Sequence, residues 1–163
     1  MAYREIFNKE EWETLELSII WMFQAIAGAD KNIDTQELKA LTTLKEKTDN
    51  FESDLLKEVL SSFNFDVSEI SDVYSIDQRE LRTGLRELAF ILENRIDIKE
   101  SLMFKKSLLA LGMYIAFASG DILLSKMSDH ELQLLIELAL FMKLPISDYR
   151  KSPTVLELME KLI

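Results

Sequence analysis

Residues 17–38 read LSIIWMFQAIAGADKNIDTQEL, an apolar run that passes directly into an acidic turn. Apolar side chains recur there at spacings of three and four, which is the repeat of one face of an α-helix. The other faces are apolar too, because Leu17, Ile20 and Trp21 fall between those positions. The pattern predicts a helix over residues 17–29 that is buried on every side. The repeating face comprises Trp12, Leu15, Ile19, Met22, Ile26 and Ala29.

A second segment of this kind, SLLALGMYIAFASG, occupies residues 107–120. Its helical repeat begins at Phe104, and Met113, Tyr114 and Phe117 fill the other faces. Both segments are shorter than the roughly 20 apolar residues that cross a bilayer. We therefore expect two core helices packed against each other and no direct insertion into a membrane.

A turn and a capped helix follow each predicted core helix. Asp34 and Glu37 have the spacing of a capping box, in which the side chains of residues N-cap and N3 satisfy each other's backbone amides. Ser128 and Glu131 repeat this spacing after the second core helix. The sequence thus predicts a weak internal repeat of core helix, acidic turn and capped helix, with an approximate two-fold relating the copies.

The remainder of the chain also favours helices. Only four Gly and two Pro occur among 163 residues, too few for a turn-rich β-fold or a low-complexity chain. Further helices are expected at about residues 52–63, 68–74 and 77–94, with Asp77 or Asp97 as a cap, and from about residue 152 onward. No flexible linker divides the sequence. We predict an all-α fold, a single compact domain of about seven helices spanning residues 1–163.

Aromatic side chains at helical spacing are assigned to the core rather than to a ligand site. The segment 77–94 carries a broad apolar stripe in which we include Phe90. The full set of stripe and aromatic core positions is Leu81, Leu85, Leu88, Phe90, Ile91, Leu92, Trp12, Trp21, Phe63, Phe65, Phe104 and Phe117.

The charge balance limits the classes of partner. With 19 basic and 29 acidic residues the net charge is −10, which repels nucleic-acid phosphates and anionic lipid. The absence of cysteine excludes disulfides, thiolate metal sites and a cysteine nucleophile. His130 is the single histidine of the sequence, so no pair of histidines can bind a metal. No apolar signal segment stands at the N-terminus, so a cytoplasmic location is expected.

Three stretches of the sequence, taken in their order along the chain, resemble the TerB tellurite-resistance family. They are residues 26–37 with the first acidic turn, residues 62–66 (SFNFD), and residues 115–138 with the second turn. The resemblance spans roughly residues 19–144. It implies an all-helical, non-enzymatic protein tied to stress responses that involve tellurite, other toxic agents and phage, with acidic turns suspected of binding metal.

The first acidic turn is a candidate site for Ca²⁺ or Mg²⁺, which prefer several oxygen ligands converging on one position. It is not an EF-hand, because the first two ligand positions would fall on Ile26 and Gly28. The alternative, which we favour, is that these residues end one helix and cap the next without an ion. Lys31 stands where the family has glycine, and its ammonium is a candidate substitute for a cation. The candidate ligands are Asp30, Asn32, Asp34 and Glu37, with Asp66 as a remote fifth.

No motif for a phosphate loop, a di-iron bundle, a zinc protease or a serine hydrolase occurs, so we predict that the protein is not an enzyme. The one basic cluster, Arg79, Arg82 and Arg86, is interpreted as ordinary ion pairing with neighbouring glutamates. The predicted function is a binding or sensing module of a stress response, with protein partners and, at most, peripheral membrane association through a partner. The alternative is a metal-independent interaction scaffold with an acidic surface.

Overall fold

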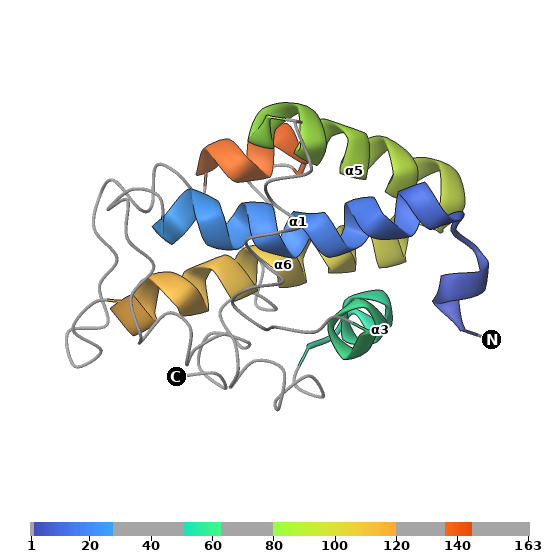
Figure 1. Cartoon of the computed structure of the whole chain (residues 1–163), viewed down its shortest axis with the longest axis horizontal. Coiled ribbons are helices and arrows are strands. Elements are labelled where there is room, and N and C mark those ends of the chain that lie inside the picture. The colour runs from blue at the N-terminus through green and yellow to red at the C-terminus, as the bar shows by residue number, and fades with distance from the viewer. Residues whose placement is uncertain (1, 28–50, 63–79, 120–135, 145–163) are drawn as a thin grey trace.

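The computed structural model of the chain describes residues 2–27, 51–62, 80–119 and 136–144, and every regular element within them is helical (Figure 1). Residues 136–141 also form a helix. The all-α class is therefore confirmed for this part of the chain, where no helix has the length and apolar character to span a membrane. The named elements are the 3₁₀ helix η1 (Tyr3–Glu5) and the α-helices α1 (Lys9–Ala27), α3 (Asp54–Ser62), α5 (Leu81–Arg95) and α6 (Ile98–Ser119).

The two predicted core helices are α1 and α6, and they pack against each other as expected. In Figure 1, α1 lies between α5 and α6 and contacts both. Ile20 and Trp21 flank the repeating apolar face of α1, one on each side of it, and both are buried. This confirms that the core covers more than one face of α1. The core also takes Phe51 from before α3, Leu55 and Leu60 from α3, and Leu138, Met142 and Leu144 from the C-terminal described segment.

Side-chain caps explain where the helices begin. Asn8 Oδ1 accepts a hydrogen bond from the Glu11 amide at 2.8 Å, and Glu11 Oε2 accepts one from the Asn8 amide at 2.9 Å, a complete capping box. This box starts α1 at Lys9, three residues before Trp12, the first position of the predicted helical repeat. Asp97 Oδ1 accepts from the Glu100 amide at 2.8 Å, which confirms Asp97 as the cap of α6.

A buried carboxylate joins the first turns of α3 and α6. Ser53 caps α3 by accepting from the Leu56 amide at 3.1 Å, and its hydroxyl donates to Glu100 Oε1 at 2.8 Å. The same Glu100 oxygen accepts from the Leu55 amide at 3.2 Å. A carboxylate at a helix N-terminus is stabilised both by these amides and by the helix dipole. The contact therefore fixes α3 across the N-terminal end of α6.

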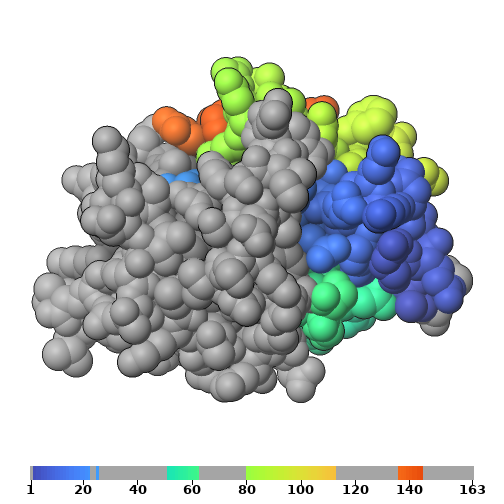
Figure 2. Space-filling view, in the orientation of Figure 1, coloured from blue at the N-terminus to red at the C-terminus, as the bar shows by residue number. Residues whose placement is uncertain are grey.

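The segment η1 is held against α3 by Glu58, whose two carboxylate oxygens accept from the amides of Tyr3 at 3.2 Å and Arg4 at 2.7 Å. Figure 2 shows the two segments side by side at the surface. Charge-assisted hydrogen bonds of this kind are stronger than neutral ones. The N-terminal residues are thus anchored before α1 begins.

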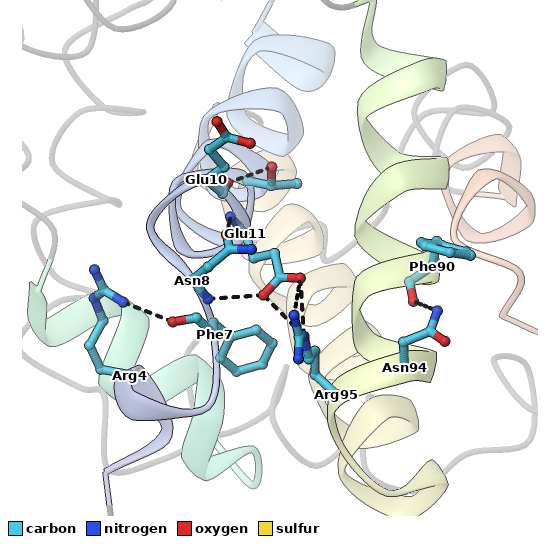
Figure 3. A network of polar contacts seen from close by, with 9 residues as sticks. Arg4, Phe7, Asn8, Glu10, Glu11, Phe90, Asn94 and Arg95 are labelled. Atoms are coloured by element: carbon cyan, nitrogen blue, oxygen red, sulfur yellow. Dashed lines mark hydrogen bonds and ion pairs between the residues drawn. The ribbon is translucent and has the colours of Figure 1, made fainter.

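Phe90 is a correction to the predicted apolar stripe. Its side chain is 64% exposed, and Figure 3 shows it on the side of α5 that faces away from α1. The buried positions of α5 are Gly84, Leu85, Leu88, Ala89 and Leu92. Because each helical residue turns by about 100°, Phe90 points almost opposite to the centre of that face. The predicted start near residue 77 is also wrong, since Glu80 is extended and α5 begins at Leu81.

Several predicted features lie outside the described residues. These are the first capped helix, both acidic turns, the start of the second capped helix, the two-fold that would relate the copies, the helices at residues 68–74 and from 152 onward, the core positions Phe63 and Phe65, and His130. The described end of the second capped helix is helical over residues 136–141, as predicted, and it contributes Ala139 and Met142 to the core. The division of residues 1–163 into one domain of about seven helices stays a prediction.

Candidate functional site

The predicted cation ligands all fall outside the described residues. Asp30, Asn32, Asp34 and Glu37 follow the described part of α1, and Asp66 follows that of α3. Within the described segments no group of three or more aspartate, glutamate, histidine or cysteine side chains is arranged to hold a metal. The cation site therefore stays a hypothesis drawn from the sequence.

An acidic groove lies between the first turns of α1 and the middle of α5. Its volume is about 420 Å³. In Figure 2 the start of α1 and the end of α5 lie side by side at the surface. Four carboxylates from two helices line this space, and those of Glu10, Glu13 and Glu87 are exposed. The groove is lined by Asn8, Glu10, Glu11, Glu13, Thr14, Glu87 and Ile91.

An ion pair joins the two helices at Glu11, which is part of the lining of the acidic groove. Arg95 of α5 reaches Glu11 of α1, with Nη2 at 3.0 Å from Oε1 and Nε donating to both carboxylate oxygens at 3.0 and 3.1 Å (Figure 3). Desolvation alone would raise the pKa of Glu11, but the hydrogen bond from the Asn8 amide and the Arg95 guanidinium outweigh it, so the pKa is lowered. We therefore assign charged Glu11 a structural role in joining α1 to α5, rather than a role in binding a partner.

A second cavity, of about 380 Å³, lies where the end of α5, the first half of α6 and the turn at residues 142–144 meet. Lys105 is only 3% exposed, yet it is part of the lining of this space. We call it the lysine cavity. Its lining is Glu93, Ile96, Ile98, Ser101, Leu102, Lys105 and Lys143.

The charge of Lys105 is poorly compensated. Glu93 Oε1 lies 4.0 Å from its Nζ, which is an ion-pair distance but too long for a hydrogen bond. Burial lowers the pKa of Lys105 most, the charge of Glu93 raises it, and the charge of Lys143 lowers it further. The net result is a lowered pKa, as expected for an ammonium that loses water without gaining close acceptors.

Lys143 enters the lysine cavity from a constrained turn. Its φ of 57° is in the left-handed region, where a residue with a Cβ costs on the order of 1 kcal/mol. Its amide donates to the Leu140 carbonyl at 3.0 Å, and the Leu144 amide donates to the Ala139 carbonyl at 2.9 Å. These two bonds form a Schellman cap, in which glycine is the usual residue at the position that Lys143 occupies.

The predicted arginine cluster is only partly described. Arg82 and Arg86 are exposed, and the Arg82 guanidinium lies 5.7 Å from the centre of the Phe141 ring, within cation–π range. Arg79 lies outside the described residues. Neither arginine belongs to the described linings of the two cavities.

Comparisons of the chain with models of known protein families, with curated proteins and with solved structures find no match. The resemblance to the TerB family therefore rests on the three quoted stretches alone.

Sequence reasoning overlooked both cavities, although each left a signal. The spacing Asn8-x-x-Glu11 is visible as a capping box. Lys105 interrupts an otherwise buried helical face on which Ser101, Leu108 and Leu109 lie. A lone lysine on an apolar face indicates a buried charge, and buried charges need a counterion. The contribution of Lys143 had no local signal, because it comes from a turn far along the chain.

Proposed function

We propose that this chain is a non-enzymatic binding module of a stress response of the tellurite-resistance type, and that it binds a basic segment of a protein partner in the acidic groove. The observation that carries the proposal is a groove lined by four glutamates from two helices. The stress-response assignment rests on the resemblance to the TerB family, and the cytoplasm is the proposed compartment.

The groove suits a basic partner because the two helices that carry its carboxylates are held together, while three of the four carboxylates are exposed. The capping box and the Arg95–Glu11 pair hold α1 and α5 together, while Glu10, Glu13 and Glu87 stay in contact with solvent. Exposed charges of one sign speed the encounter with an oppositely charged partner and orient it, more than they add affinity. Binding should therefore weaken as salt shortens the Debye length, which is about 8 Å at physiological ionic strength.

A peptide titration tests the groove directly. We would titrate the full chain with a short peptide of alternating lysine and alanine, and follow backbone amide shifts by NMR. The proposal expects shifts centred on Glu10, Glu13 and Glu87, and loss of binding when all three are changed to Gln. The matched control replaces three exposed carboxylates outside the groove, Glu5→Gln with Glu52→Gln and Glu137→Gln, and should retain binding. Equal loss in both variants would show that only the overall charge of the protein matters.

A second candidate function, sensing of a divalent cation, is supported by the acidic turn in the sequence. Asp30, Asn32, Asp34, Glu37 and Asp66 would supply the oxygen ligands for Ca²⁺ or Mg²⁺. A cation that binds only the native state raises the thermal midpoint. We expect this rise in the wild type and its loss in Asp30→Asn if the site operates. No rise at millimolar Ca²⁺ or Mg²⁺ leaves the metal-independent scaffold as the better description.

A further inference from the structure

The lysine cavity contains a buried cation that the described residues do not satisfy. The side chain of Lys105 is 4% exposed, while its one ion-pair partner, Glu93, is 47% exposed and 4.0 Å away. An ammonium has three donor hydrogens, and within the described segments Lys105 makes no hydrogen bond. The ammonium thus has donors without an acceptor among the described residues, and Lys105 lines a space that a ligand can enter.

A second positive charge faces the same space. Lys143 lies in the lining of the lysine cavity, and its charge adds a smaller contribution to the lowering of the Lys105 pKa that burial causes. The lining carries two ammonium groups against one carboxylate, and that carboxylate is half in solvent. Two like charges in a partly dry site repel each other, and an anion placed between them relieves both the repulsion and the desolvation. A ligand that complements this site should therefore carry an anionic group.

The remaining lining is mostly apolar. Ile96, Ile98 and Leu102 provide aliphatic surface, and Ile98 is 79% exposed at the rim. A volume of about 380 Å³ is near the lower end of the range for small-molecule sites, about 300–1,000 Å³. Inorganic phosphate or sulfate would leave that aliphatic surface uncovered. The shape and polarity instead match a molecule with one anionic end and a short hydrocarbon body.

We propose that the lysine cavity binds a small aliphatic monocarboxylate, whose carboxylate accepts hydrogen bonds from Lys105 and pairs with Lys143, and whose alkyl chain lies against Ile96, Ile98 and Leu102. The described linings of this site and the acidic groove share no residue, so the inference does not rest on the proposed function.

The test uses hexanoate as the probe. Titration of the full-length chain, followed by NMR, should give saturable shifts at the amides of Leu102, Lys105 and Lys143. Hexanol, which has the same chain without the charge, and acetate, which has the charge without the chain, should each bind at least about tenfold more weakly. Comparable binding of hexanol and hexanoate would overturn the proposal, as would an absence of saturable shifts.

Three variants assign the interaction to this cavity. Lys105→Met keeps the length and apolar stem of the side chain and should weaken hexanoate at least about tenfold. Ile98→Ser, at an exposed rim position that the core does not need, should weaken hexanoate but leave acetate unchanged. The matched control is Lys106→Met, the next lysine on α6, which is not part of the described lining. Unchanged affinity in both Lys105→Met and Ile98→Ser, with thermal unfolding still cooperative, would exclude this site.

Discussion

Gly84 determines how closely α5 can approach α1. A Cβ built at this position would lie 2.5 Å from Trp21 Cη2 and 2.6 Å from Cζ2, far inside van der Waals contact. The Trp21 ring is buried, so it has little room to move aside. The glycine therefore serves packing between helices, since its φ does not require glycine.

Gly84→Ala is expected to destabilise the protein, although alanine is the better helix former. The substitution gains about 1 kcal/mol in helix propensity, but overpacking a closed core costs about 1–3 kcal/mol and the clash here is severe. We expect a net loss of about 1–2 kcal/mol in the free energy of unfolding, measured by urea denaturation. Thr83→Ala, at an exposed neighbouring position, should change it by less than about 0.5 kcal/mol. A more stable Gly84→Ala would mean that Trp21 repacks without cost.

The buried Lys105 also leads to a prediction about how the stability of the protein depends on pH. Its pKa in the native state is lowered from the ordinary 10.5, chiefly by burial, so between the two pKa values the unfolded state binds more protons. Stability must then rise as pH increases through that window. Among the described residues, the charges of Glu93 and Lys143 modify this effect in opposite directions.

Lys105→Met should remove this rise in stability. We expect the variant to be at least as stable as the wild type near neutral pH, because a buried charge with poor compensation is replaced by an apolar side chain of similar length. The difference in unfolding free energy should shrink as the pH approaches 10. Urea denaturation of both proteins at several pH values measures it. A variant that is less stable at pH 7 and equally dependent on pH would show that the Glu93 pair is net stabilising.

At the scale of the element, the start of α1 depends on the capping box of Asn8 and Glu11. Asn8→Ala removes the acceptor for the Glu11 amide and is expected to cost about 1 kcal/mol, the usual value for an N-cap side chain. Because the box also positions Glu11 for Arg95, the amides of the first turn of α1 should exchange faster with solvent. Hydrogen exchange and urea denaturation check the two effects.

The control for Asn8→Ala is a substitution that removes a hydroxyl without removing a helix cap. Ser61→Ala deletes an exposed side chain whose hydroxyl bonds only the Lys57 carbonyl inside α3, and it should be nearly neutral. An equal cost for both substitutions would mean that the box does not set the start of α1.

At the scale of the whole molecule, hydrophobic periodicity predicted more than side-chain chemistry did. The two core helices follow from apolar residues on every face, and burial of such a segment leaves few alternatives to a central helix. The same periodicity wrongly placed Phe90 in the core. The apolar stripe of that segment is wider than the face that is buried, and the sequence pattern does not show which residue of the stripe stays exposed. The lysine cavity depends on Glu93, Lys105 and Lys143 meeting from three elements, and no local pattern encodes that meeting.

The net charge of −10 leads to the last prediction, that sodium chloride raises the thermal midpoint. Excess charge of one sign destabilises the compact state through self-repulsion, which salt screens. Glu16 is a local example: burial raises its pKa most and the charge of Glu13 raises it further, against a weaker effect of Arg4. Salt also weakens exposed ion pairs, but one such as Arg95–Glu11 contributes only about 0–1 kcal/mol, so the gain should dominate.

Calcium chloride at the same ionic strength separates screening from binding. If only screening acts, the two salts should raise the thermal midpoint by similar amounts, apart from the somewhat stronger general effect of a divalent ion. An additional rise with calcium that disappears in Asp30→Asn, but persists in Glu5→Gln, would assign it to the acidic turn rather than to the surface charge. A midpoint that falls with sodium chloride would contradict the prediction, because it would mean that attractive pairs outweigh the repulsion among the excess carboxylates.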